Sequence, residues 1–145
     1  MLNISNRKQY TYLLKHSITK CTEFILVVVP EIELNTNGAK VLDRLKPYLK
    51  EKKKGYEWPG TQRFEDGDPV TIYHYSLNEH SINILLQSAD SLYSWVQPNL
   101  PEDLCFIKED GSVWVYTSSH EEMSWVEDES DEELNFIENI NNLAK

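Results

Sequence analysis

Hydrophobic positions recur along the chain in patterns that predict both helices and strands. Apolar residues at three- and four-residue spacings after Ser5, a potential N-cap, predict a helix over 6–20. The run from Phe24 to Val29 is continuous, mostly β-branched and ended by Pro30, which is typical of a strand covered on both faces. We therefore expect this strand at the centre of a sheet.

Helical spacing resumes with Val41 and Leu45 and predicts a helix that Pro47 kinks and Gly55 ends. The four lysines within 50–54 fall in its last turns, where cations favour the helix dipole. The sequence therefore predicts a solvated helix end for this basic run.

The next segments predict a hairpin and a second long helix. Alternating β-branched and aromatic residues indicate a strand over 70–75, which we expect to pair with 60–64. Ser76 and Glu79 have the spacing of a capping box, and apolar residues from Ile82 to Val96 follow helical spacing behind them.

The last third of the chain predicts a second hairpin and a C-terminal helix. Asp110-Gly111 separates two strand-like runs, 104–108 and 113–117, and Asp-Gly favours a tight hairpin turn. Ser130 and Glu133 form another capping-box pattern before an apolar stripe that ends near 143.

These elements predict one α+β domain over 1–145, with a small mixed or antiparallel sheet packed by about four helices. The length of 145 residues suits one hydrophobic core. A content of 40% hydrophobic and 11% aromatic residues is too high for a disordered chain, despite the net charge of −10. Whether the acidic segment 121–133 is ordered stays open.

Charge is distributed unevenly between the two halves of the chain. Residues 1–63 hold twelve Lys/Arg against six Asp/Glu, whereas residues 64–145 hold two against eighteen. The acidic excess is densest from Glu121 to Glu138 and includes Glu127, Asp128 and Glu129. Such a face repels phosphate backbones and attracts basic protein surfaces, so direct nucleic-acid binding is disfavoured.

The sequence contains no recognisable catalytic or cofactor motif. The four histidines lack metal-ligand spacing, and five glycines provide no phosphate-binding loop, so we expect neither a metal nor a cofactor. Enzymatic activity is disfavoured without being decided. Cys21 and Cys105 lie in apolar runs and indicate buried thiols of a reducing compartment. With no apolar run long enough to cross a bilayer, we expect a cytoplasmic protein.

One aromatic segment stands out as a candidate binding site. Trp58 lies in a Pro/Gly turn, where an exposed tryptophan would suit an interface, although it could equally cover the core. The candidate binding residues are Trp58, Gly60, Thr61, Glu102, Asp103, His120, Glu121, Glu127, Asp128 and Glu129.

A resemblance covers about residues 57–122. It rests on Glu-Trp-Pro-Gly-Thr at 57–61, Leu-Pro-Glu-Asp-Leu-Cys-Phe at 100–106, Asp-Gly at 110–111 and Ser-His-Glu at 119–121. In this order the motifs resemble small uncharacterised proteins of Bacillus-type bacteria, some of which carry the name stage III sporulation protein AH. The resemblance implies a bacterial or phage origin and a compact α/β unit, and it implies no reaction.

Three functions remain in competition at this stage. The leading hypothesis is a non-enzymatic protein-binding module of immunity, antitoxin or inhibitor type, whose acidic face meets a basic partner. The first alternative is a small enzyme or ligand-binding protein with a pocket near Trp58, Glu102, Asp103 and His120. The second is an acidic nucleic-acid mimic. The oligomeric state is not determined by the sequence.

Overall fold

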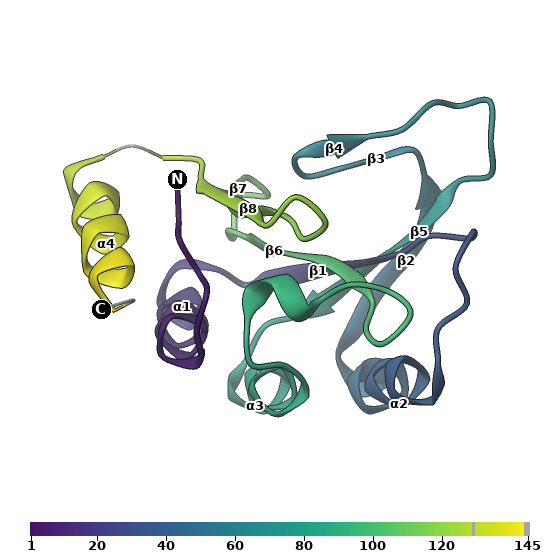
Figure 1. Ribbon diagram of the computed structural model, residues 1–145, viewed down its shortest axis with the longest axis horizontal. Coiled ribbons are helices and arrows are strands. Elements are labelled where there is room, and N and C mark those ends of the chain that lie inside the picture. Colours follow the sequence, from purple (N-terminus) through teal and green to yellow (C-terminus); the bar gives the residue numbers. More distant parts are fainter. Residues whose placement is uncertain (129, 144–145) are drawn as a thin grey trace.

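The computed structural model describes residues 1–128 and 130–143 and is built on an antiparallel sheet (Figure 1). Six strands lie in the order β2-β5-β1-β6-β7-β8, and each neighbouring pair is antiparallel. A separate hairpin joins β3 to β4. With four α-helices in the described residues, the predicted α+β class is confirmed. The strands are β1 Glu23–Val28, β2 Leu49–Gly55, β3 Glu57–Trp58, β4 Thr61–Gln62, β5 Val70–Ser76, β6 Glu102–Ile107, β7 Val113–Ser118 and β8 Met123–Val126.

Strand β1 lies inside the sheet, between β5 and β6, as predicted from its continuous apolar run. Phe24 and Leu26 join the larger hydrophobic cluster, whereas Ile25 and Val27 join a smaller cluster on the other face. All four side chains are at most 3% exposed. Burial on both faces explains why this strand shows no polar alternation.

Three helices cover one face of the sheet, and the hairpin β3–β4 lies on the opposite side (Figure 1). The fourth helix, α4, stands beside α1 at the end of this helical row. The sheet therefore has one face under helices and another that is only partly covered. The helices are α1 Arg7–Lys20, α2 Thr36–Leu45, α3 Glu79–Ser88 and α4 Asp131–Asn142, with short 3-10 turns at Lys46–Tyr48 and Leu92–Ser94.

The basic run does not form a helix end, so that prediction was wrong. Helix α2 ends at Leu45, Pro47 lies in the 3-10 turn that follows, and the lysines lie on the edge strand β2. This strand pairs only with β5 among the described strands, and most of its residues are exposed. Lysines on an edge strand discourage pairing with other chains, which accounts for their density here.

The predicted hairpin between 60–64 and 70–75 was also wrong in its pairing. Strand β4 pairs with β3 across the Pro59-Gly60 turn, whereas β5 pairs with β1 and β2. Gly60 has a φ of +81°, a conformation that glycine adopts without strain. The tight turn therefore binds β4 to its immediate neighbour and leaves β5 free to enter the main sheet.

Helix α3 is shorter than the apolar stripe predicted. It begins after Asn78, whose side chain accepts from the backbone of Ser81, and it ends at Ser88 rather than near Val96. Asn78 is thus the N-cap in place of the predicted Ser76. The apolar residues that follow Ser88 belong to a 3-10 turn and a loop that pack against the same core.

At the ends of the chain, caps were predicted with mixed success. Asn6 caps α1 in a capping box with Gln9, in place of Ser5. Ser130 caps α4 as predicted, but the Glu133 carboxylate accepts instead from Trp114. The hairpin of β6 and β7 is confirmed, and β8 was not predicted.

Candidate functional site

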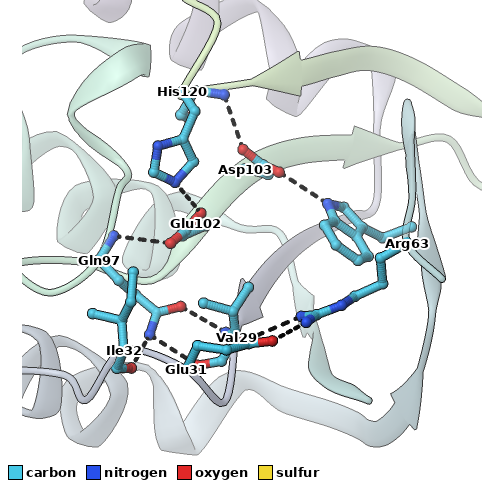
Figure 2. Close-up of polar contacts among 10 residues, drawn as sticks. Val29, Glu31, Ile32, Arg63, Gln97, Glu102, Asp103 and His120 are labelled. Atoms are coloured by element: carbon cyan, nitrogen blue, oxygen red, sulfur yellow. Dashed lines mark hydrogen bonds and ion pairs between the residues drawn. The ribbon is translucent and has the colours of Figure 1, made fainter. Parts of the chain in front are cut away.

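A groove on the less covered side of the sheet brings together most of the candidate residues. Figure 2 shows the polar contacts of Glu102, Asp103 and His120 in it. The volume of the groove is about 650 Å³. Four segments form its walls: the loop after β1, the hairpin β3–β4, the start of β6 and the turn after β7. It is lined by Val29, Glu31, Ile32, Trp58, Gly60, Thr61, Gln62, Arg63, Glu102, Asp103, Ser118, His120 and Glu121.

Trp58 connects the hairpin to the sheet. Its indole Nε1–H donates to Asp103 Oδ2 over 2.9 Å, and its ring packs with Ile25, Val27 and Cys105. The side chain is only 8% exposed, so the prediction of an exposed tryptophan was wrong and the alternative of a cover over the core holds. One wall of the groove is thus a buried, hydrogen-bonded ring.

Asp103 is the residue that holds this corner together. Its second carboxylate oxygen, Oδ1, accepts from the Ser119 backbone N–H over 2.9 Å, so one side chain binds both the hairpin and the turn after β7. The backbone at Asp103 has a φ of +56°, a left-handed conformation that aspartate tolerates better than most residues. Asp103 is 5% exposed and therefore serves mainly to position its neighbours.

Glu102 and His120 form the most polar contact of the groove. Glu102 Oε1 lies 2.7 Å from His120 Nε2, and Glu102 Oε2 accepts from the Gln97 backbone N–H over 3.3 Å. Burial raises the pKa of the Glu102 carboxyl above its usual range, and the neighbouring His120 only partly opposes that effect. The His120 side chain is 59% exposed, so the pair joins a buried carboxyl to a solvent-accessible ring.

Two further contacts fix the rim near the β1 loop. Gln97 accepts from Val29 N–H over 2.6 Å and donates to Val29 O over 3.2 Å, which anchors the start of that loop. Arg63 forms an ion pair with Glu31 across the rim (Figure 2). The loop and the hairpin are thereby joined on the side opposite His120.

The structure brings seven of the predicted site residues into one groove. They are Trp58, Gly60, Thr61, Glu102, Asp103, His120 and Glu121. Glu127 and Asp128 do not line it and lie exposed after β8, and Glu129 lies outside the described residues. Beside Tyr116, the Glu127 carboxylate raises the pKa of the tyrosine to about 12.

Sequence reasoning missed Glu31, Arg63 and Gln97. Each lies in an irregular segment whose neighbours carry no periodic pattern. Only the opposite charges of Glu31 and Arg63 offered a signal, and charge alone does not identify a partner at that separation in sequence.

Within the described residues, neither a reactive cysteine nor a cluster of metal ligands accompanies the groove. Cys105 is buried, and burial raises the pKa of its thiol to about 12, while the thiol donates to the Asp103 carbonyl over 3.2 Å. It is therefore unsuited to act as a nucleophile. Within residues 1–128 and 130–143, no three His, Cys, Asp or Glu side chains are grouped to hold a metal ion. Among the described helices, none has the length and apolar character needed to cross a membrane.

Comparison with known proteins adds no relative. No protein-family model, curated protein or solved structure matches the chain. The resemblance of residues 57–122 to small Bacillus-type proteins therefore stays a prediction.

Proposed function

We propose that the chain is a non-enzymatic, cytoplasmic protein-binding module of immunity, antitoxin or inhibitor type, and that the groove receives a basic side chain of its partner. The supporting observation is the charge of the lining. It contains four acidic residues, Glu31, Glu102, Asp103 and Glu121, but only one arginine and one histidine, Arg63 and His120. Arg63 pairs with Glu31, Glu102 contacts His120 and Asp103 accepts two N–H groups, so the exposed Glu121 is the carboxylate that would meet a cation from outside.

Exposed apolar residues beside the groove supply the second requirement of an interface. Phe64, the residue after Arg63, is 86% exposed, and Ile32 in the lining is 38% exposed. Aromatic residues at the centre of an interface commonly contribute much of the binding energy. The anchor expected at Trp58 is therefore reassigned to Phe64.

The acidic C-terminal segment contributes to attraction over distance. Glu121, Glu127 and Asp128 are exposed, Glu132 is exposed but pairs with Lys20, and Glu133 is buried against Trp114. Only the exposed carboxylates act on an approaching partner. The expected signature is an association rate that falls as salt rises.

The test is affinity capture from the lysate of the source cells at low salt, followed by binding measurements with the purified partner. Phe64→Ala should weaken binding at least about tenfold, because it removes an aromatic anchor. Glu121→Gln should lower the association rate and its dependence on salt. Because both residues are exposed, neither substitution should change folding stability.

Two matched variants serve as controls. Leu134 is a 50% exposed apolar residue on α4, and Glu138 is an exposed carboxylate on the same helix, and neither lines the groove. Leu134→Ala should bind like the unmodified protein, and Glu138→Gln should lower the association rate less than Glu121→Gln, because Glu138 does not line the groove. The proposal would be refuted by a partner whose affinity is unchanged in Phe64→Ala and whose association rate is unchanged in Glu121→Gln. The absence of any salt-sensitive partner would also refute it.

The Glu102–His120 pair supports a second candidate, a small enzyme using the same groove. A carboxylate that accepts from Nε2–H leaves His120 Nδ1 as the basic nitrogen, which could remove a proton from water or a hydroxyl group. Turnover of ester or phosphoester substrates that disappears in His120→Ala would favour this candidate. A purified protein without such turnover would leave the binding module as the sole proposal.

A further inference from the structure

A second hollow lies on the same side of the sheet as the groove, across the β3–β4 hairpin from it. Its volume is about 370 Å³, within the range of about 300–1,000 Å³ typical of small-molecule sites. Its apolar lining comes from Ile25, Ile72, Ile107 and Val113, on four adjacent strands. Trp58 lines both hollows, so one indole separates two distinct cavities. We call this second cavity the sheet-face hollow.

The lining of the sheet-face hollow also carries an excess of negative charge. Its lining contains three glutamates and a single lysine, namely Glu23, Glu51, Glu57 and Lys53. Strand register explains part of this arrangement, because Glu51 pairs with His74, which pairs in turn with Ile25 on β1. One row across the sheet thus leads from the polar Glu51 and His74 to the apolar Ile25.

His74 adds a polar group without adding a positive charge. Its side chain is 17% exposed, and Nδ1 lies 3.9 Å from Glu23 Oε1. Burial lowers the pKa of the imidazole, with Lys53 and Lys50 acting in the same direction and Glu51 and Glu23 against it. The ring is therefore neutral at pH 7. Lys50 lies 3.7 Å from Glu23 and offsets part of that carboxylate, leaving Glu51 and Glu57 as the less compensated charges.

We propose that the sheet-face hollow binds a small organic cation, an amine carried on an aromatic or branched apolar body. The body would lie on the isoleucine floor against Trp58, and the ammonium group would face Glu51 and Glu57. An apolar floor with a few polar groups at its edge is the usual composition of a ligand site. The excess of carboxylates over lysine selects a cation over an anion of the same shape.

Two probes that share the same indole ring but carry opposite charges test this proposal. Tryptamine and indole-3-propionate are titrated into the ¹⁵N-labelled full chain and followed by NMR. Tryptamine should shift the Trp58 indole resonance and the amides of Ile72 and His74 in a saturable way at millimolar concentration. Indole-3-propionate should leave these resonances in place. Equal binding of both probes, or no saturable shift with tryptamine, would overturn the proposal.

Charge variants sharpen the test without disturbing the core. Glu51 and Glu57 are exposed, so replacement by glutamine should not unfold the protein. Glu51→Gln should weaken tryptamine binding about threefold, and Glu51→Gln with Glu57→Gln about tenfold. The control Glu138→Gln, on α4, should have no effect. Unchanged affinity in the double variant would refute the assignment.

The proposal is independent of the function proposed for the groove. Phe64 and Glu121 do not line the sheet-face hollow, so Phe64→Ala and Glu121→Gln should bind tryptamine normally. If these variants lost the amine while Glu51→Gln kept it, the amine would belong to the groove and the proposal would fail.

Discussion

Two tryptophans donate their indole N–H to buried carboxylates, one in each hydrophobic cluster. Trp114 donates to Glu133 over 3.0 Å and links β7 to α4, and Trp58 donates to Asp103 over 2.9 Å and links the hairpin to β6. The bonds are nearly identical. Their surroundings differ, since Trp114 is fully buried in the larger cluster and Trp58 is 8% exposed at the edge of the smaller one.

The two rings therefore have different roles, since Trp114 packs in the core and Trp58 forms a wall of two hollows. The Trp114 ring lies between Phe106 and Phe136, with ring centroids 6.2 Å and 5.2 Å away, so it is enclosed by other side chains. The Trp58 ring has packing on one side and borders two hollows on the others. A buried carboxylate therefore stabilises a core in one place and holds the wall of a groove in the other.

The largest effect should come from removing each ring. Trp114→Ala should cost about 3–5 kcal/mol of unfolding free energy, because it leaves an enclosed cavity and removes the N–H group that Glu133 Oε2 accepts. Trp58→Ala should cost about 2–3 kcal/mol, because fewer packed neighbours are lost beside the existing hollows. Urea unfolding of both variants measures the difference. Equal losses would show that the two rings have the same structural role.

The two carboxylate variants should differ in the opposite order, with smaller losses of unfolding free energy. Asp103 accepts two N–H groups, so Asp103→Asn places an amide N–H against a donor and should cost about 1–3 kcal/mol. Asparagine tolerates the left-handed backbone there, which removes strain as an explanation. Glu133→Gln keeps an acceptor for Trp114 and weakens only the contact to Lys20, so it should cost about 1 kcal/mol or less.

The two carboxylate variants are compared by thermal and urea unfolding under identical conditions. If Glu133→Gln proved more destabilising than Asp103→Asn, the importance assigned to the double acceptor at Asp103 would be wrong.

The smallest expected effect is a pH dependence on the less covered side of the sheet. The pKa of His74 is lowered from 6.5, mainly by burial, so the unfolded chain binds the proton more readily than the folded chain. Stability should therefore fall as pH drops through 6.5 toward the folded pKa.

The measurement is unfolding free energy against pH for three proteins. His74→Gln should flatten this part of the profile, whereas His80→Gln, at an exposed position in the first turn of α3, should keep it. An unchanged slope in His74→Gln would assign the titration to another group.

The sequence predicted elements well where local pattern and tertiary surroundings agree. The run from Phe24 to Val29 is apolar at every position, and a strand inside the sheet buries every position. Asp110-Gly111 favours a tight turn, and the strands beside it pair with each other. Ser130 caps its helix because the required N–H groups lie within one turn of it.

The lysine run and the first hairpin show where local pattern fails. Lysine favours helices in isolation, yet the residues after Pro47 pair with β5 because the sheet has an open edge there. Strand β4 could have paired with either of its neighbours in sequence, and the Pro59-Gly60 turn favours β3. The choice between alternative strand partners depends on the whole sheet, and a short stretch of sequence does not contain that information.

For the candidate site, the sequence by itself determined the chemistry, and the tertiary structure decided the geometry. Its residue types indicated an acidic protein without a catalytic motif, and most of the proposed groove residues do lie together. Only the fold revealed that Trp58 is a buried wall, that Arg63 reaches Glu31 and that Phe64 is the exposed aromatic. Side-chain type and local spacing act over one or two turns of chain, whereas burial and ion pairing depend on which distant segments the sheet places side by side.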